Sequence, residues 1–471
     1  MIRILSISLF RAELGTRMPF RYGIAEMKRL PHVFVLLEAE INGVVSRGIA
    51  ADHLPPKWFT KDPERDLAGE IDDMAAVIRH AADAARGLQG GNVFDIWEKL
   101  NAGQGAWGAK AGFPPLLAHF GTSLMERALI DAFCRQRKRP FHELLHADAF
   151  GLRLGRIHPE LEGTSARDWL PANPLPSVHC RHTVGLSDPL AEADIPPAEK
   201  LTDGLPQSLE ACIRRYGLSQ FKLKFTSDRA QSVPRLCRIL AVIGREIGGR
   251  FAASLDGNES FKTVGDFRGF WEEATAKPEL APLFANLLFV EQPFHRDIAL
   301  GEEVGAALRG WSDRPAIIID ESDAETDSLR RALACGYAGT SHKNCKGVFR
   351  GVANACFLAW RRKTNPATTS LMSAEDLTNI GPVALLQDLA VQAALGNESV
   401  ERNGHHYFRG LSFWPESIQR EMLALHGDLY VALADGSPSL SIKEGRIDLH
   451  SVNAAPFGIA PLPAVETFPR L

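Results

Sequence analysis

Apolar and polar residues alternate near the N-terminus in a way that predicts an antiparallel sheet. A period of two marks three strands, and Asn42-Gly43 is a typical hairpin turn between the last two: Ile2–Phe10, Val33–Glu40 and Val44–Ile49. From residue 63 to about residue 145, apolar residues return at helical spacing instead. We therefore expect residues 1–147 to form an α+β domain.

A different pattern begins near residue 178, where short apolar segments alternate with amphipathic helical stretches. Eight such segments at roughly 30-residue intervals predict an α/β fold, a closed TIM-type barrel of seven or eight β/α units. An open doubly wound sheet is the alternative, but no GxGxxG or GxxxxGK[ST] motif follows a strand. The predicted strands are Val178–Gly185, Ser219–Phe225, Phe251–Asp256, Leu287–Glu291, Ala316–Asp320, Tyr337–Lys343, Ala367–Met372 and about His405–Leu411.

These patterns divide the chain into four parts. Residues 1–147 form a capping domain, 148–177 a linker or long loop without clear period, 178–427 the barrel with the active site, and 428–471 a C-terminal return to the capping domain. Within the return, Leu440–Leu449 is typical of a hairpin that comes back to the N-terminal sheet.

Composition narrows the function classes. The 471 residues carry 53 Lys+Arg against 57 Asp+Glu, so nothing favours binding to nucleic acid. No apolar run approaches the roughly 18 residues of a membrane helix, and the N-terminus is typical of a strand rather than a signal peptide. The seven cysteines are scattered, without a CxxC pair or a Cys/His cluster. We therefore expect no structural zinc and reduced thiols in a cytoplasmic protein.

Charged residues fall at the ends of the predicted barrel strands. Lys222 and Lys224 occupy alternate positions of one buried-looking strand, so both point to the barrel interior. The next four strands end in Asp256, Glu291, Asp320 and Lys343. Because the C-terminal strand ends form the mouth of such a barrel, these side chains should share one cavity.

Three carboxylates at one mouth repel one another unless a cation joins them. A single carboxylate there is more often a helix cap or a loop anchor, but three in successive units flanked by lysines are harder to explain that way. Oxygen ligands without His or Cys suit Mg²⁺, with Mn²⁺ as the alternative. Asp256, Glu291 and Asp320 are therefore the expected metal ligands.

The set LysxLys, AspxAsn, GluGlnPro, AspGluSer and a lysine on the sixth strand resembles the enolase superfamily. The pattern is closest to its muconate lactonizing enzyme subgroup, within the mandelate racemase/muconate lactonizing enzyme family. The resemblance covers most of the chain. It includes a capping-domain helix and its exit, a mobile capping loop and a C-terminal return: Glu126–Phe133, Pro140–Leu145, Arg17–Gly23 and Gly445–Ile459.

The resemblance implies proton abstraction next to a substrate carboxylate, through an enediolate that the divalent ion stabilises. Lys224 is then the base on one face of the substrate, and Lys222 is its electrostatic partner, since a second positive charge favours a neutral lysine. Lys343 is the second acid/base or a cation that stabilises the intermediate. Asn258 serves the metal's surroundings or the substrate, and Phe20 of the capping loop meets the substrate at the mouth.

Specificity residues are harder to place. Ser373–Gly381 resembles the family's seventh-strand motif, in which either Glu375 or Asp376 supplies the acid, unless both help to start the helix near Gly381-Pro382. The predicted eighth unit lacks the AspxAsp motif of dipeptide epimerases, which argues against a dipeptide substrate. His405, His406 and Arg409 either meet an anionic or hydroxylated group or are ordinary loop side chains.

We therefore expect a Mg²⁺-dependent, homo-oligomeric isomerase or lyase that acts on a small carboxylate. The favoured reaction is racemisation, epimerisation or cycloisomerisation, and dehydration of an acid sugar is the alternative. A barrel that keeps the metal site without catalysis is the minor option.

Overall fold

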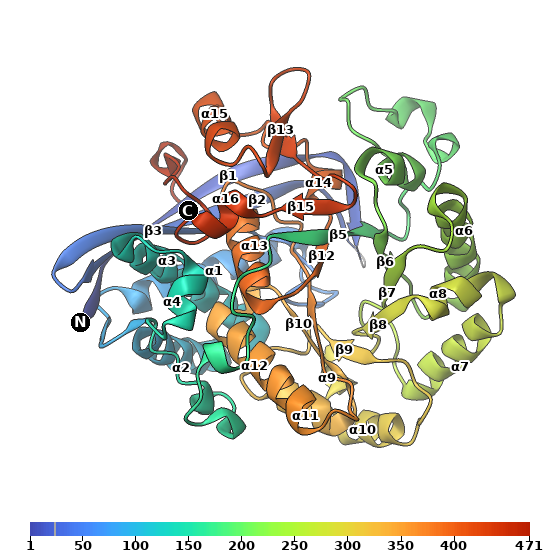
Figure 1. Cartoon of the computed structure of the whole chain (residues 1–471), viewed down its shortest axis with the longest axis horizontal. Coiled ribbons are helices and arrows are strands. Elements are labelled where there is room, and N and C mark those ends of the chain that lie inside the picture. Colours follow the sequence, from blue (N-terminus) through green and yellow to red (C-terminus); the bar gives the residue numbers. More distant parts are fainter. Residues whose placement is uncertain (23–24) are drawn as a thin grey trace.

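The N-terminal region folds as an antiparallel sheet that closes one side of the molecule (Figure 1). The computed structural model describes residues 1–22 and 25–471. The four strands of the sheet lie in the order β3-β2-β1-β4. The predicted turn is confirmed, since Asn42 and Gly43 both have positive φ angles, 51° and 81°. The strands are β1 (Ile2–Tyr22), β2 (Ala25–Ile41), β3 (Val44–His53) and β4 (Gln89–Gly90).

Helices cover the inner face of this sheet. α3 approaches β3 so closely that a Cβ at Gly48 would lie 2.1 Å from the carbonyl oxygen of Ala128, which explains the glycine. The apolar core of the cap continues into the barrel helix α12, where Phe94 packs against Phe349 with ring centroids 5.6 Å apart. The cap helices are α1 (Leu67–Ala85), α2 (Val93–Ala111), α3 (Pro115–Arg137) and α4 (Phe141–His146).

The predicted barrel is present. In the described part of the chain, eight parallel strands run in sequence order, and β12 pairs with β5 to close them. Figure 1 shows the helices on the outside. The strands are β5 (Ser177–Val184), β6 (Gln220–Lys224), β7 (Ala252–Asp256), β8 (Leu287–Glu291), β9 (Ile317–Ile319), β10 (Gly339–His342), β11 (Leu371–Ala374) and β12 (Ser399–Arg402). The helices are α5 (Leu209–Tyr216), α6 (Arg229–Ile247), α7 (Val264–Thr275), α8 (Ala281–Ala285), α9 (Arg296–Ala299), α10 (Glu302–Arg309), α11 (Ser328–Cys335), α12 (Val348–Thr364), α13 (Ala384–Leu395), α14 (Gly404–Tyr407), α15 (Glu416–Leu425) and α16 (His450–Ala454).

The eighth strand was predicted in the wrong place. It spans Ser399–Arg402, whereas Gly404–Tyr407, inside the predicted segment, forms the short helix α14. The strand Ser-Val-Glu-Arg holds one apolar residue, so its hydrophobic pattern is too weak to predict a buried strand. The seventh strand also starts later than predicted, at Leu371, because residues 365–368 form a turn.

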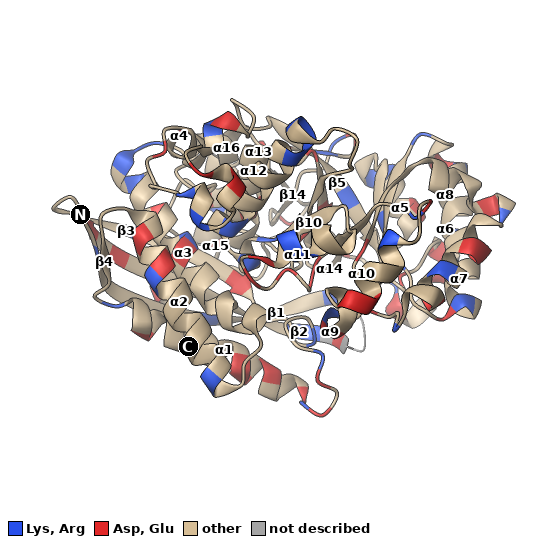
Figure 2. Cartoon of the chain, turned by 90° about the horizontal axis from the view of Figure 1, so that it is seen from below, with Lys and Arg blue, Asp and Glu red and all other residues tan. Residues whose placement is uncertain are grey.

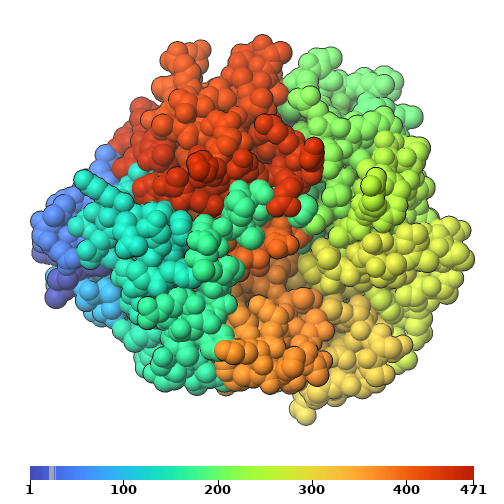
Figure 3. All heavy atoms as spheres, in the orientation of Figure 1, coloured from blue at the N-terminus to red at the C-terminus, as the bar shows by residue number. Residues whose placement is uncertain are grey.

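Residues 148–177 and the C-terminal segment hold the two parts together. The former contains the 3₁₀ helices η1 (Leu154–Arg156), η2 (Pro159–Leu161) and η3 (Ala166–Asp168), whose apolar residues join the cap's core. The predicted hairpin at 440–449 is reduced to a tight turn, in which Lys443 and Arg446 form an antiparallel bridge. The flanking strands pair elsewhere: β14 (Pro438–Leu440) pairs with β13 (Tyr430–Ala432), and β15 (Arg446–Asp448) adds antiparallel to β5. The last residues reach the cap sheet, where the Leu471 N–H donates to the Leu9 carbonyl oxygen at 3.1 Å. Figure 3 shows this segment in red beside the cap helices in cyan and the first barrel units in green.

The surface mixes both charge signs, as the balanced composition predicts. Figure 2 shows acidic and basic residues interspersed over outer helices such as α1 and α7. No helix among the described residues has the length and apolar character needed to cross a membrane.

Glu126 ties the cap to the barrel. Its carboxylate, on α3, accepts hydrogen bonds from the backbone N–H groups of Val348 and Phe349 at the start of α12, at 3.0 and 2.7 Å. Burial raises the pKa of Glu126 to about 7, although these hydrogen bonds oppose the rise. The folded state therefore binds the Glu126 proton more tightly than the unfolded state does, and the contribution of Glu126 to stability falls as pH rises from about 4.5 to about 7.

The measured quantity is the difference in unfolding free energy between the wild type and Glu126→Gln. We expect this difference to fall by about 1.4 kcal/mol per pH unit between about pH 4.5 and about pH 7. Denaturant unfolding at several pH values measures this difference, with Glu143→Gln on the exposed part of α4 as a control variant. A difference that stays constant from about pH 5 to about pH 7 would contradict this account of Glu126.

Candidate active site

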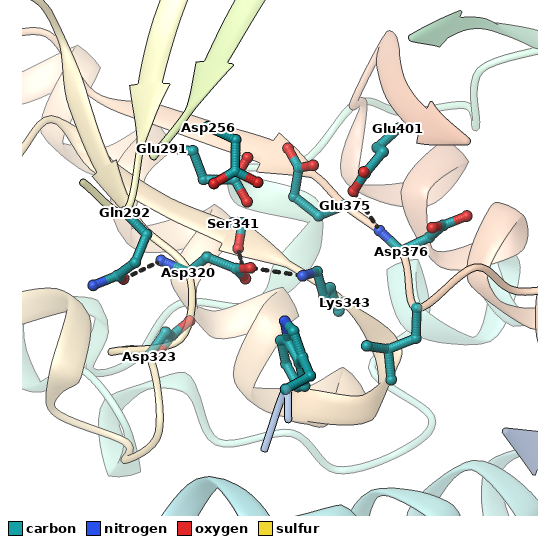
Figure 4. A network of polar contacts seen from close by, with 12 residues as sticks. Asp256, Glu291, Gln292, Asp320, Asp323, Ser341, Lys343, Glu375, Asp376 and Glu401 are labelled. Carbon is teal, nitrogen blue, oxygen red and sulfur yellow. Dashed lines mark hydrogen bonds and ion pairs between the residues drawn. The ribbon is translucent and has the colours of Figure 1, made fainter. Parts of the chain in front are cut away.

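The ends of the barrel strands converge on one cavity beneath the cap. Figure 4 shows carboxylates from successive strands turned toward a common centre. The residues that line the cavity include most of the predicted site: Lys222, Lys224, Asp256, Asn258, Asp320, Lys343, Asp376 and Phe20. Glu291 and Glu375 are not among the lining residues; both are buried and contact Lys222.

Lys222 lies at the centre of the carboxylates. Its Nζ is 3.0 Å from Asp256, 2.9 Å from Glu291, 2.8 Å from Glu375 and 3.1 Å from Glu401. Burial alone would lower the pKa of Lys222, but these carboxylates raise it well above its usual value. These acids favour the ammonium form of Lys222, which links the ends of four strands. Lys222 also lies two residues from Lys224 on the same strand.

Removing this cation should destabilise the protein. Lys222→Met leaves four buried acids without their shared partner, and loss of one partner of a buried ion pair typically costs about 3–5 kcal/mol. We expect a lower melting temperature, partly restored by Mg²⁺ if a cation can take the place of the ammonium. Thermal unfolding with and without Mg²⁺ checks this, with the exposed Lys277→Met as the matched control. An unchanged melting temperature would show that Lys222 does not hold the acids together.

Lys224 lies at the edge of the same group, two residues farther along β6. Its Nζ donates to Asp256 Oδ2 at 2.5 Å and to Asn258 Oδ1 at 2.7 Å. Asn258 is held in turn, since its backbone N–H donates to Asp256 Oδ1 at 2.8 Å. The AspxAsn motif thus positions Lys224 at the cavity wall, and Asn258 contacts the lysine directly.

Lys343 enters from the end of β10. Its Nζ is 2.6 Å from Asp320 Oδ2 and lies 4.4 Å from the ring centroid of Trp58. Burial would lower the pKa of Lys343, but Asp320 raises it above its usual value. Lys346, to which the sequence assigns no role, contacts the other oxygen of Asp320 at 2.8 Å. Asp320 is thus held between two lysines, which together keep its pKa well below its usual value although burial opposes this.

Of the three lysines that line the cavity, Lys224 and Lys343 lie on strands that face each other across the barrel. β6 is its second strand and β10 its sixth, so three strands lie between them in either direction around the closed sheet. A small molecule bound between them would present opposite faces to Lys224 and Lys343.

The predicted ligands of a divalent ion, Asp256, Glu291 and Asp320, end three adjacent strands. Burial and the neighbouring Asp256 and Glu375 raise the pKa of Glu291 well above its usual value. Glu291 Oε2 lies 2.9 Å from the ammonium of Lys222. A set of carboxylate oxygens that repel one another fits a hard divalent cation.

The two candidates on the seventh strand have different surroundings. Glu375 ion-pairs with Arg181 of β5 and with Lys222 beneath the cavity. Asp376 lines the cavity and binds Arg402 at 3.2 Å, while burial raises its pKa to about 7. Neither caps α13, which begins at Ala384.

Glu401 is the acid that sequence reasoning missed. It lies on β12, lines the cavity, and accepts a hydrogen bond from the Thr183 hydroxyl at 2.6 Å. The misplaced eighth strand hid it: with the strand ending at Arg402, Glu401 and Asn403 both line the cavity. The true strand end also lacks an AspxAsp motif.

The cap closes the mouth with Phe20, Pro55 and Trp58. Pro19, next to Phe20, lines a neighbouring surface hollow instead, and Gly23 lies outside the described residues. The loop after β3 is anchored to the barrel, because Arg296 donates to the Trp58 and Phe59 carbonyl oxygens at 2.9 and 2.8 Å. Sequence reasoning missed this loop, although Pro55-Pro56 directly after a strand is a signal for one.

His405, His406 and Arg409 do not line the cavity. Arg409 pairs with Asp435 at 2.6 Å, and the two histidines are buried behind β5. They therefore do not meet a ligand in the cavity.

Comparisons with known proteins agree with this architecture. No family model and no curated protein matches the chain. Among solved structures it is similar to a dipeptide epimerase from Enterococcus faecalis V583 complexed with Mg and the dipeptide L-Leu-L-Tyr (TM-score 0.60, 15% identity, 97% of this chain and 99% of that one). It is also similar to an N-succinyl Arg/Lys racemase from Bacillus cereus (0.59, 15%, 96% and 97%). A third is an enolase from Bradyrhizobium complexed with magnesium and mandelic acid (0.59, 13%, 100% and 99%). The chain therefore shares the fold of these solved structures, a closed barrel with a capping domain over its mouth.

Proposed function

We propose that this protein is a divalent-cation-dependent enzyme that removes the α-proton of a small carboxylate, as a racemase, epimerase or cycloisomerase. The observation that carries the proposal is the pair of lysines on opposite sides of a cavity whose floor holds buried carboxylates. The solved structures of similar fold include a racemase and an epimerase, and two of them contain magnesium.

Asp256, Glu291 and Asp320 would hold the cation, with Mg²⁺ favoured over Mn²⁺ by an all-oxygen set. When bound, the cation supplies positive charge that stabilises the negative charge developing on the substrate carboxylate during proton removal.

A lysine must be neutral to accept a proton. In this structure Lys224 and Lys343 each donate to an acid of the proposed metal site, Asp256 and Asp320 respectively. A cation held by these acids would compete with both lysines for Asp256 and Asp320, and would take from Lys343 the negative partner that favours its ammonium form.

The cap excludes water from this chemistry. Phe20 and Trp58 are both buried, and they place apolar surface over the lysines. A dry cavity strengthens the electrostatic interactions between the substrate and the charged floor. Asp376, Glu401 and Asn403 line the wall beyond the lysines, so the distal part of the substrate should carry hydrogen-bond donors.

A one-base reaction is the second candidate. Asp320 and the face of Trp58 both favour the charged form of Lys343, which suits a cation that stabilises the intermediate. Lys224 would then be the single base, and dehydration or cycloisomerisation would follow. A barrel without catalysis is the minor alternative. The homo-oligomeric state and the cytoplasmic location remain predictions.

Exchange of the substrate α-proton with D₂O tests the proposal. Sugar acids, N-acyl amino acids and lactones, incubated with the protein and Mg²⁺, are followed by proton NMR. Loss of an α-proton signal supports the proposal, and the effects of Lys224→Ala and Lys343→Ala on each enantiomer separate two-base from one-base chemistry.

A further inference from the structure

A second group of ligand-type side chains lies behind β5, outside the central cavity. His182 on β5, Cys212 on α5 and His406 on α14 each offer one ligand atom, and these three atoms lie within 4.8 Å of one another. All three residues are buried, and none of them lines the central cavity. These residues come from distant parts of the sequence and form no local Cys/His motif. The sequence analysis, which relied on such motifs, therefore predicted no zinc site.

The spacing of these atoms suits tetrahedral coordination. Cys212 Sγ is 3.6 Å from His406 Nδ1. With Zn–S near 2.3 Å and Zn–N near 2.0–2.1 Å, the sulfur–nitrogen edge of a tetrahedral site is about 3.6 Å. His182 is fixed by a further contact, because its Nδ1 lies 3.1 Å from His405 Nε2. A neighbour on the second ring nitrogen is typical of histidines that bind metals.

A soft divalent cation binds cysteine as the thiolate, so binding at this cluster would release the proton of the Cys212 thiol.

One charged side chain near the cluster, Arg17, is itself ion-paired. Arg17, which donates to the His406 carbonyl oxygen at 2.9 Å, is ion-paired with Asp203 at 2.6 Å. Moreover, His405 Nδ1 is buried and has no hydrogen-bond partner among the described residues, so hydrogen bonding within the protein leaves the imidazole cluster incomplete.

We propose that His182, Cys212 and His406 bind one thiophilic divalent cation of the Zn²⁺ class, at a site separate from the carboxylates. Two imidazoles and a thiolate prefer Zn²⁺ or Co²⁺, whereas the carboxylate site prefers Mg²⁺, so the two sites select different ions. The bound ion would tie β5 and α5 to α14. Because Tyr407 of α14 packs against Phe20 with ring centroids 4.1 Å apart, the site would also brace the capping strand at the mouth.

Co²⁺ is the probe for the test. The full-length protein is treated with a chelator, supplied with excess Mg²⁺ to fill the carboxylate site, and titrated with Co²⁺ while its absorption is recorded. We expect one equivalent of Co²⁺ to bind with a thiolate-to-cobalt band in the near ultraviolet and the intense visible bands of tetrahedral cobalt, and Zn²⁺ to remove both. Asp256→Asn should keep these bands, which separates this site from the proposed magnesium site.

Cys212→Ser should lose the thiolate band, whereas Cys134→Ser, which changes a buried cysteine of α3, should keep it. His182→Gln gives a second variant if Cys212→Ser does not fold, and it should lose the tetrahedral bands. A wild-type protein that shows no thiolate band with Co²⁺, or a band that persists in Cys212→Ser, would overturn the proposal.

Discussion

Replacing Lys224 with alanine is expected to abolish exchange of the α-proton of one substrate enantiomer, while the other enantiomer still exchanges through Lys343. The reason is geometric: the two lysines lie on strands that face each other across the barrel, so each reaches one face of the α-carbon. Loss of a positioned general base typically costs about 10²–10⁴-fold in rate. Exchange of each pure enantiomer in D₂O, followed by NMR, measures the effect.

Lys343→Ala should show the reverse preference. Lys277→Ala, which removes an exposed lysine just after α7 that does not line the cavity, is the matched control and should leave both rates unchanged. If Lys224→Ala and Lys343→Ala lose exchange of both enantiomers equally, the two-face geometry fails. Lys343 would then be an electrostatic stabiliser, and the one-base reading would replace racemisation.

Asp256→Asn and Glu291→Gln are expected to lower Mg²⁺ affinity by at least about 10–100-fold. Loss of a residue that only hydrogen-bonds to a metal ligand typically has an effect of this size, and loss of a ligand should cost no less. Each change replaces one negative oxygen donor of the proposed metal site with a neutral amide of nearly the same volume. Calorimetric titration with Mg²⁺ measures the affinity, and circular dichroism shows whether the fold is intact. Asp297→Asn, at an exposed position of α9, is the control.

An unchanged affinity in a folded Asp256→Asn or Glu291→Gln variant would remove that residue from the metal site. If both variants bind Mg²⁺ as the wild type does, the acids serve only to hold Lys222 and Lys224.

The sequence predicted the barrel and much of its charged floor because each of these residues follows an apolar strand. Asp256 and Glu291 end strands whose apolar residues make the strand visible, so their position at the mouth follows from the fold. Glu401 was missed because β12 contains one apolar residue, and a pattern of period two cannot be recognised in four positions.

Other parts of the site depend on contacts between distant segments. Trp58 contacts Lys343 from a loop that Arg296 of the barrel holds through a hydrogen bond. The cluster of His182, Cys212 and His406 likewise has no spacing rule in sequence, since three separate elements bring it together. Such contacts between distant segments can be identified only in the folded structure. The end of a strand, in contrast, can be predicted from the local pattern of apolar residues.

The most direct test of the central claim is Mg²⁺-dependent exchange of a carboxylate α-proton. The wild-type protein is incubated with the acid library in D₂O, with Mg²⁺ or with a chelator, and the double variant Lys224→Ala/Lys343→Ala is treated in the same way. We expect at least one acid to lose its α-proton signal with the wild type and Mg²⁺, and to keep it with the chelator or the double variant. Exchange that continues at the wild-type rate in the double variant, or in chelator, would contradict catalysis by these lysines over a cation held by the three carboxylates.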